Sequence, residues 1–376
     1  MQFQYHLPVN LIFGCGAADR IGREAAKYGA KALVVTGRHS AKKSGLLDRA
    51  TGLLHAAGVQ AVVFDQVTQN PLTTTAQAGA DLAKREGCSV VVGLGGGSIM
   101  DAAKGIAFLA CNSADVNDYI FGRKVSDKAL PLVLVPTTCG TGSEGNGFAV
   151  LSNPETKDKK SLRGAMLVAK ASIIDPQLMT TMPKRVLASV GFDALSHNME
   201  AYLSTAAQPM TDVLAVEGMR LIAENLPKVY RGGAGMDAWE RMAWGSTLGG
   251  MVINTAGVAG AHGMEHPASG LRDIVHGRGL AALTPALYRR SVAAAPERFA
   301  VISRALGGRG AADCVGRIEA LLDSIDLHIT LGEQGILAED IPWMVENCQK
   351  VSAPSMKNHP AALTKDEIAE VYRAAL

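Results

Sequence analysis

Short runs of branched apolar residues alternate with helical patterns along the first half of the chain. The runs predict buried strands at 32–36, 60–64, 89–92 and 132–135. Apolar positions at helical spacing between them predict helices from just after Gly37 to about residue 57, at 73–86 and at 99–109. This alternation is typical of a mostly parallel sheet that is covered on both faces.

The pattern changes near residue 183. Apolar residues between Val213 and Ile222 recur at helical intervals, and further helical patterns cover 238–252, 314–325 and 364–375. We find no convincing strand run in this half. The sequence therefore predicts an α/β domain over residues 1–182 and an all-helical domain over residues 183–376.

Composition narrows the class of protein. Of the 376 residues, 48% are hydrophobic and 19% are charged, which is ordinary for a globular chain. A net charge of +2 disfavours a nucleic-acid partner. Basic residues cluster briefly at Arg38–Lys43 and Lys157–Arg163, and we interpret both clusters as solvated faces.

The location of the protein is predicted from its cysteines and its apolar segments. The six cysteines form no C-x-x-C pair, as expected for reduced thiols. We see no secretory signal at the N-terminus and no apolar stretch near the roughly 18 residues of a membrane helix. We therefore expect a cytoplasmic protein with no membrane segment.

Glycine and threonine follow two successive predicted strands. Glycines next to a helix start let the backbone and its unpaired N–H groups approach a phosphate, and Ser98 is placed to cap that helix. A plain turn and a loop that satisfies its own hydrogen bonds remain the alternatives. The residues expected to bind the cofactor in these segments are Gly95, Gly96, Gly97, Ser98, Asp101, Thr137, Thr138 and Thr141, and Asn70 is added from the segment after the second strand.

Three histidines and one aspartate in the second half suggest a metal site. Asp193 and His197 are spaced i,i+4 and share one face of a helix. His262 and His276 follow fourteen residues apart. Imidazole and carboxylate ligands together suit Fe(II), Zn(II), Co(II) or Ni(II) better than Ca(II) or Mg(II).

Two other readings compete for residues near this set. The segment from His262 to His266 matches H-x-x-E-H, the inverted motif of zinc proteases. That motif needs a continuous helix, which Gly263 weakens and Pro267 is expected to end. Cys139 is a candidate nucleophile, but a buried inert thiol is the simpler interpretation because no histidine is near it in the sequence.

Together these blocks resemble the iron-dependent (group III) alcohol dehydrogenases over nearly the whole chain. The blocks that carry the resemblance are Gly95-Gly96-Gly97-Ser98-x-x-Asp101, Pro136-Thr137-Thr138-x-Gly140-Thr141-Gly142-Ser143-Glu144, Asp175-Pro176, Gly191-Phe192-Asp193-Ala194-Leu195-Ser196-His197, His262-Gly263-Met264-Glu265-His266-Pro267 and His276-Gly277. The resemblance implies a dinucleotide-binding α/β domain, a helical metal domain, a cleft between them and commonly a homodimer, in the fold shared with dehydroquinate synthase.

The resemblance also implies site roles. Asp193, His197, His262 and His276 become the ligands of Fe(II), with Zn(II) possible, and His266 lies near the nicotinamide as a candidate proton relay. The implied reaction is metal-assisted hydride transfer between a small alcohol or aldehyde and NAD or NADP. A polyol dehydrogenase, a dehydroquinate synthase-like lyase and, more distantly, a zinc protease remain alternatives.

The chain departs from the family pattern at three places. Gly37 occupies the position after the 32–36 strand where many members carry an acid, and Ser40 lies close by among basic residues. Removing that acid removes repulsion of a 2′-phosphate, so we expect a preference for NADP(H) with NAD(H) accepted. Cys139 replaces a small alanine, and residues 268–275 lack an aromatic residue, which leaves the substrate open.

Overall fold

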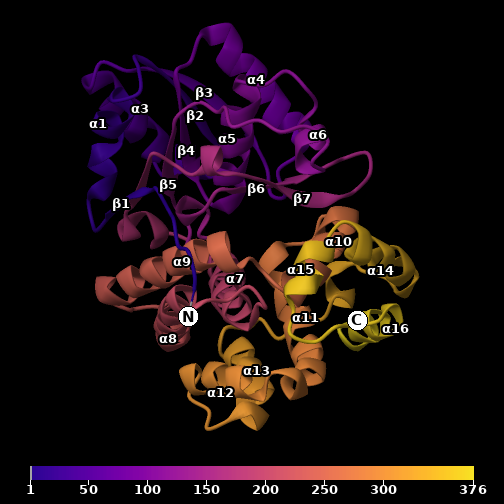
Figure 1. Ribbon diagram of the computed structural model, residues 1–376. Helices are drawn as coiled ribbons and strands as arrows, with labels where there is room; N and C mark the ends of the chain where they lie inside the picture. Colours follow the sequence, from indigo (N-terminus) through magenta and orange to yellow (C-terminus); the bar gives the residue numbers. More distant parts are fainter. Residues whose placement is uncertain (1) are drawn as a thin grey trace.

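A six-stranded sheet forms the centre of the N-terminal half of the computed structural model, which describes residues 2–376 (Figure 1). The strand order is β1-β8-β5-β4-β2-β3, and every neighbouring pair runs parallel. These strands are β1 (Asn10–Phe13), β2 (Lys31–Gly37), β3 (Gln60–Val67), β4 (Val90–Gly95), β5 (Leu132–Pro136) and β8 (Ala171–Ile174). Their carboxyl ends share one edge of the sheet, which is where open α/β sheets bind ligands.

Helices cover both faces of the sheet, because successive residues of each strand point to opposite sides. Ala32 and Val34 pack with one group of helices, while Leu33 and Val35 pack with the other. The helices of this half are α1 (Ile21–Ala26), α2 (Ser40–Lys43), α3 (Leu46–Ala56), α4 (Thr73–Glu86), α5 (Gly97–Ala110) and α6 (Val116–Ile120). The predicted α/β class with a mostly parallel sheet is confirmed.

Two details of the predicted helices are wrong. The helix expected from Gly37 to about residue 57 is two helices, because Gly45 between them has a φ of +73°, a left-handed conformation that interrupts a helix. The helix expected from residue 99 begins at Gly97, with Gly96 as its N-cap and no side-chain capping bond. Ser98 is therefore the second residue of α5 and does not cap it.

The apolar patterns do not predict β1, β8 or a separate two-stranded antiparallel ribbon. The ribbon consists of β6 (Phe148–Ser152) and β7 (Lys159–Arg163). Its register pairs Phe148 with Arg163 and Val150 with Ser161. Lys159 is buried within it, so the prediction that Lys157–Arg163 is a solvated face is wrong for this lysine.

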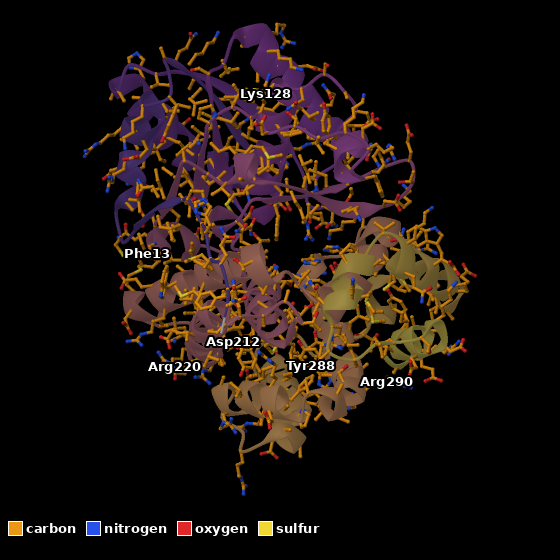
Figure 2. All side chains as sticks on the ribbon, in the orientation of Figure 1. Phe13, Lys128, Asp212, Arg220, Tyr288 and Arg290 are labelled. Carbon is orange, nitrogen blue, oxygen red and sulfur yellow. The ribbon has the colours of Figure 1, made fainter. Side chains whose placement is uncertain are left out.

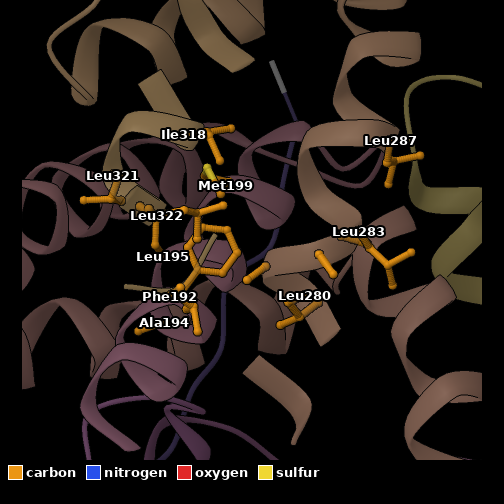
Figure 3. Packing of buried hydrophobic residues seen from close by; sticks show 14 of the residues in the cluster. Phe192, Ala194, Leu195, Met199, Leu280, Leu283, Leu287, Ile318, Leu321 and Leu322 are labelled. Carbon is orange, nitrogen blue, oxygen red and sulfur yellow. The ribbon is translucent and has the colours of Figure 1, made fainter. Parts of the chain in front are cut away.

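After β8 the described chain holds helices and no further strand, as predicted. Its α-helices are α7 (Lys184–Leu203), α8 (Pro209–Arg231), α9 (Met236–Ala256), α10 (Gly260–Arg272), α11 (His276–Ser291), α12 (Pro296–Ala305), α13 (Cys314–Ser324), α14 (Ile341–Lys350), α15 (Ala353–Asn358) and α16 (Lys365–Ala374). Phe192 and Met199 of α7 pack with Leu280 of α11 and Ile318 of α13 in the core of this half (Figure 3). The domain boundary at 182/183 stays a prediction.

The two halves meet along α9. Phe13 at the end of β1 lies edge-on to Trp244 of α9, with ring centroids 5.9 Å apart. Figure 2 places Phe13 at the level where the sheet half meets the helical half. None of the helices within residues 2–376 is long and apolar enough to cross a membrane.

Candidate active site

A cleft joins the loops after β4 and β5 to the helices α7, α10 and α11. Its cavity volume is about 380 Å³. Residues from both halves of the chain line it, including Gly96, Thr138, Asp193, His262 and His276. The cleft therefore brings the predicted cofactor segments and the predicted metal cluster into one space.

Glycine is required where the loops after β4 and β5 touch. A Cβ atom on Gly96 would lie 3.0 Å from Oγ1 of Thr138, and one on Gly97 would lie 2.1 Å from Cγ2 of Thr141. A larger residue would force the two loops apart. The first N–H groups of α5 have no hydrogen-bond partners within the helix. They can therefore donate to a phosphate, which the glycines allow to come close to the backbone.

Most residues predicted to bind the cofactor line this cleft, and four do not. Those that line it are Asn70, Gly96, Gly97, Ser98, Asp101, Thr138 and Thr141. Gly95 is the last residue of β4 and Thr137 is the first residue after β5, and neither lines the cleft. Gly37 lies beside it, since a Cβ on Gly37 would lie 3.4 Å from Cδ1 of Ile99, which does line the cleft. Ser40 is exposed at the start of α2 and does not line the cleft.

Asp101 and Asn70 have other partners. The Asp101 carboxylate accepts hydrogen bonds from the Ser143 hydroxyl at 2.6 Å and from the Val150 N–H at 3.1 Å. The Asn70 amide, at a residue with a φ of +43°, donates to Asp273 Oδ1 at 2.7 Å and accepts from Lys159 Nζ at 3.0 Å. These contacts show Asn70 joining the two halves of the molecule.

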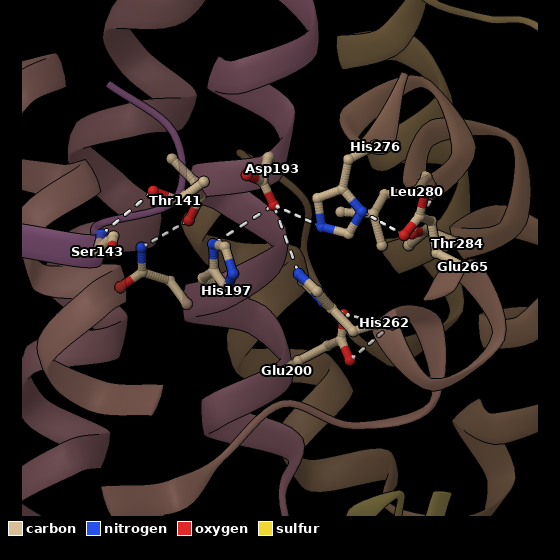
Figure 4. A network of polar contacts seen from close by, with 12 residues as sticks. Thr141, Ser143, Asp193, His197, Glu200, His262, Glu265, His276, Leu280 and Thr284 are labelled. Atoms are coloured by element: carbon tan, nitrogen blue, oxygen red, sulfur yellow. Dashed lines mark hydrogen bonds and ion pairs between the residues drawn. The ribbon is translucent and has the colours of Figure 1, made fainter. Parts of the chain in front are cut away.

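The four predicted metal ligands converge at the other side of the cleft. Oδ1 of Asp193 lies 3.4 Å from Nδ1 of His197, 3.4 Å from Nε2 of His262 and 3.6 Å from Nε2 of His276. Figure 4 shows the three rings arranged around this carboxylate. Asp193, His262 and His276 each offer an atom within 4.8 Å of the other two, and His197 joins them through Asp193.

The chemistry of this cluster fits a metal ion. Asp193 Oδ1, His197 Nδ1 and His262 Nε2 are buried and have no hydrogen-bond partner among residues 2–376. Buried polar atoms without partners destabilise a fold, so atoms that converge in this way point to a missing ligand. Nitrogen and oxygen donors suit Fe(II) or Zn(II).

Electrostatics prepare the cluster for a cation. Burial raises the pKa of the Asp193 carboxyl, but the adjacent histidines outweigh burial and hold that pKa well below its usual range. Burial lowers the pKa of His262, and Glu200 outweighs burial and raises it to about 10. The raised pKa favours a proton on the His262 ring when no metal is bound. A metal ion would replace that proton.

Two buried carboxylates orient the rings from behind (Figure 4). Glu200 lies 2.6 Å from Nδ1 of His262 and also accepts the Ala259 N–H at 2.6 Å. Glu265 contacts Nδ1 of His276 and lies 3.6 Å from Nζ of Lys159. A carboxylate at the outer nitrogen fixes the ring and directs the other nitrogen inward.

His266 faces the same cleft without belonging to the set around Asp193. Its ring centroid lies 6.1 Å from that of His262 and 5.7 Å from that of His276. Burial, followed by the nearby Lys159 ammonium, lowers the pKa of His266 well below its usual value. The ring is therefore neutral near pH 7.

The inverted protease motif fails for a different reason from the one expected. Pro267 does not end the helix, because α10 continues to Arg272 with Pro267 inside it. Gly263 is retained for packing, since a Cβ there would lie 2.7 Å from Sδ of Met356. The burial of α10 thus overrides both helix breakers. Glu265 contacts His276 and Ser269, so it is not free to act as a protease base.

The structure shows the environment of the two other departures from the family pattern, Cys139 and residues 268–275. Cys139 is fully buried, and burial raises the pKa of its thiol to about 12, which confirms an inert thiol. Arg272 pairs with Asp340 at 2.6 Å, and Val275 is the member of 268–275 that lines the cleft.

Sequence reasoning missed three polar side chains in and around the cleft. Glu200 lies on the same face of α7 as Asp193 and His197, a spacing that would have revealed it. Glu265 stands in the H-x-x-E-H match, but nothing in the sequence indicates its contact with His276. The buried ammonium of Lys104 donates to oxygens of Ser143, Asn146 and Phe148 at 2.7–3.0 Å, and no sequence pattern predicts that cluster.

Family comparisons divide the chain into two matching parts. The sequence profile described as "Iron-containing alcohol dehydrogenase" matches residues 8–176. The profile described as "Fe-containing alcohol dehydrogenase family, C-terminal" matches residues 187–376.

Individual proteins are similar over their full lengths. A 1,3-propanediol dehydrogenase of Klebsiella pneumoniae is 34% identical over 99% of this chain and 98% of its own. An NAD-dependent methanol dehydrogenase of Bacillus methanolicus is 31% identical over 99% of both chains. The crystal structure of an archaeal halo-thermophilic alcohol dehydrogenase from a Red Sea brine pool superposes with a TM-score of 0.96, at 34% identity over 100% of this chain and 99% of its own.

Proposed function

The chain belongs to the iron-containing alcohol dehydrogenase family, and we propose which of its residues carry the reaction. It is an oxidoreductase that transfers a hydride between a small alcohol and a nicotinamide cofactor. The observation that carries our assignment is the cluster of unpaired Asp and His atoms facing the cleft that the glycine and threonine loops also line.

Asp193, His197, His262 and His276 are the proposed ligands of one divalent ion, Fe(II) or alternatively Zn(II). When bound, the ion supplies a Lewis acid that stabilises negative charge on the substrate oxygen. Glu200 and Glu265 hold the His262 and His276 rings with their inner nitrogens toward Asp193. This orientation is set before any substrate enters the cleft.

The loops after β4 and β5 are proposed to hold the dinucleotide. Gly96 and Gly97 let the α5 start approach the pyrophosphate, and the hydroxyls of Ser98, Thr138 and Thr141 face the same cleft. Holding the nicotinamide beside the substrate supplies position, and hydride transfer itself is the chemistry of the cofactor.

His266 is the proposed proton acceptor during alcohol oxidation. It is neutral because burial depresses its pKa, and it lines the cleft next to the metal cluster. In the reverse direction the same ring would return the proton to the oxygen of the aldehyde.

We propose NADP(H) as the preferred cofactor, with NAD(H) accepted. Gly37 leaves room beside Ile99, and Arg38, His39 and Lys43 are exposed around it. Asp65 on β3 forms an ion pair with Lys42. This lysine therefore already has a partner, and its partner is a carboxylate. That carboxylate is the reason to expect some activity with NAD(H).

A polyol substrate is the second candidate. It is supported by the similarity to a 1,3-propanediol dehydrogenase over nearly the whole chain. A homodimer and a cytoplasmic location are also part of the proposal; the six cysteines are all unpaired in the fold, as reduced thiols would be.

The proposal is tested by following nicotinamide absorbance with the metal-loaded enzyme. Simple alcohols, diols and aldehydes are each assayed with NAD(H) and with NADP(H). We expect turnover that is lost on chelation and restored by Fe(II) or Zn(II). Full turnover in the chelated protein, or none with any alcohol or aldehyde, would overturn it.

A further inference from the structure

The ribbon that closes one side of the cleft carries an arginine with no counter-charge. Arg163 of β7 lines the cavity, and it makes no hydrogen bond or ion pair with any residue in the described range 2–376. Every other cation of the ribbon has a partner: Lys159 contacts Asn70 and Glu265, and Lys160 donates to the Val351 carbonyl at 2.7 Å. The Arg163 guanidinium is thus the one cation of the ribbon that has no partner among residues 2–376.

Arg163 lies at the end of β7, next to the end of the loop that follows β5, where the Gly164 N–H donates to the Gly147 carbonyl at 3.0 Å. Its guanidinium stacks on the ring of Phe148, 4.5 Å from the centroid, and the two residues pair across the ribbon. Phe148 packs against the cluster that contains Ile253 and Val258, which line the cavity. The adjacent Gly147 N–H donates to Asn254 of α9 at 3.0 Å.

The position of the metal cluster indicates which part of the substrate contacts the apolar surface beside Arg163. Val258 precedes α10, which carries His262, so the Phe148–Ile253–Val258 surface lies next to the cluster. The glycine and threonine loops line the same cavity. With the dinucleotide on those loops, this apolar surface is left for the part of the substrate beyond its reacting carbon.

Charge in the cavity favours an anion there. The cavity-lining carboxylates are both committed: Asp101 to Ser143 and Val150, and Asp193 to the histidine cluster. Arg163 is exposed in the cleft, and no carboxylate among residues 2–376 pairs with it. Lys160 lies close enough to add positive potential.

We infer that the substrate is a small aldehyde or alcohol that carries a carboxylate at the end remote from the reacting carbon, and that Arg163 binds this carboxylate. A guanidinium and a carboxylate form two parallel hydrogen bonds, which suits a planar terminal group better than a hydroxyl. The apolar surface between Arg163 and the cluster matches a short methylene chain. The inference rests on the proposed function and specifies its substrate class.

Arg185 is the other cavity-lining arginine whose side chain has no hydrogen-bond or ion-pair partner among residues 2–376. It lies in the first turns of α7, whose Val190 packs against Gly140 of the loop after β5. It is exposed at the cleft. We assign terminal-carboxylate recognition to Arg163, because Phe148 holds its guanidinium in place, and Arg185→Met serves as a comparison.

The test compares matched aldehydes with the metal-loaded enzyme. Initial rates are measured for 4-oxobutanoate and butanal, which have the same chain length and differ in the terminal carboxylate. We expect a kcat/KM for 4-oxobutanoate at least roughly tenfold above that for butanal, and Arg163→Met to remove that advantage through KM. The rate with butanal and the KM for the dinucleotide should stay unchanged, and Arg163→Lys should restore part of the advantage.

A matched control is available on the surface. Arg123 also lies over a phenylalanine ring, that of Phe121 at 5.6 Å, but outside the cavity. Arg123→Met should therefore leave the ratio of the two aldehydes unchanged. Three results would overturn the inference. Arg163→Met could lower kcat/KM equally for both aldehydes, or it could change the KM for the dinucleotide. Alternatively, Arg185→Met could abolish the advantage of 4-oxobutanoate over butanal. Absence of any nicotinamide-linked turnover would instead remove the proposed function.

The inference also has a readout without turnover. Butanedioate, a dead-end analogue with the same terminal group, should bind the parent enzyme in a calorimetric titration and bind Arg163→Met roughly tenfold more weakly. Equal affinities for the two proteins would contradict carboxylate binding at Arg163.

Discussion

At the scale of single residues, Glu200 and Glu265 decide which nitrogen each ring presents to Asp193. Both carboxylates are buried and sit behind His262 and His276. His266, on the same helix as His262, has no such partner among residues 2–376 and faces the cleft. The difference separates the proposed ligands His262 and His276 from the proposed proton acceptor.

Replacing His266 by alanine tests that separation. The variant should keep its metal, because His266 is not part of the set around Asp193. Turnover should fall by roughly 10²-fold, the scale of a lost proton-transfer group. Metal content and kcat are measured on the same preparation. A variant that lost its metal along with its turnover would make His266 a ligand.

Gly37 tests the choice of cofactor. A Cβ there would meet Ile99 and Val67 at 3.4 and 3.6 Å, which are ordinary contacts, so Gly37→Asp should fold. The new carboxylate repels a 2′-phosphate and should shift the ratio of kcat/KM values toward NAD by roughly 1–3 kcal/mol. A parent enzyme that already prefers NAD strongly would show that the missing acid does not choose the cofactor.

The residues that could be predicted have partners close by in the sequence, whereas the missed residues have partners that are distant in the sequence. Asp193 and His197 could be paired from the sequence because one helix turn separates them. The role of Lys159 could not be predicted, since its partners Asn70 and Glu265 lie far away in sequence and meet it only in the folded chain. The same holds for Arg163, whose basic neighbours suggested solvent.

At the scale of elements, close contact between α9 and the loop after β5 positions the threonines. A Cβ on Gly250 of α9 would lie 1.8 Å from the carbonyl oxygen of Gly142. Gly142 itself has a φ of +58°, which favours glycine. Both glycines are needed to seat the loop that carries Thr141.

Two alanine substitutions with opposite expected results test this contact. Gly250→Ala should lower the free energy of unfolding by roughly 1–3 kcal/mol and raise the KM for the dinucleotide, because α9 must move away from the loop. Gly316→Ala in α13 meets nothing within 4 Å and should raise stability by roughly 0.5–1 kcal/mol. Urea unfolding measures both, and equal changes in the two variants would contradict the contact.

The elements that were predicted and those that were missed differ in their patterns. Strands β2, β4 and β5 are buried on both faces and give continuous apolar runs. The ribbon β6–β7 places Lys159, Ser161 and Arg163 toward the cleft, so it lacks an apolar alternation. β1 and β8 have four residues each, too few for a pattern.

At the scale of the whole molecule, polar contacts across the cleft couple the two halves. Asn70 and Lys159 from the sheet half meet Asp273 and Glu265 from the helical half. Glu265 also contacts the ligand candidate His276, so the position of the ribbon and the orientation of that ring are linked. Such linkage between distant segments was beyond prediction from sequence patterns.

His359, which is buried in the helical half, contributes to the acid stability of the fold. Burial outweighs the nearby Glu200 and lowers the pKa of His359 to about 4, against about 6.5 when unfolded. Between these values the unfolded chain binds more protons, so the free energy of unfolding falls as pH drops from about 6.5 to about 4, by up to roughly 3 kcal/mol.

His359→Gln should flatten that dependence, because glutamine can keep a hydrogen bond with Ser291 and does not titrate. Urea unfolding of both proteins at pH 7 and pH 4.5, with metal removed from each, isolates the difference. The parent should lose more stability than the variant on acidification. Parallel losses would show that His359 does not control it.

The metal-to-chain ratio tests the central claim most directly. The account predicts one Fe(II) or Zn(II) per chain in the parent protein and a ratio near zero in His276→Ala, with the helical content of the variant preserved. An unchanged ratio in His276→Ala would contradict the assignment of Asp193, His197, His262 and His276 as the metal site.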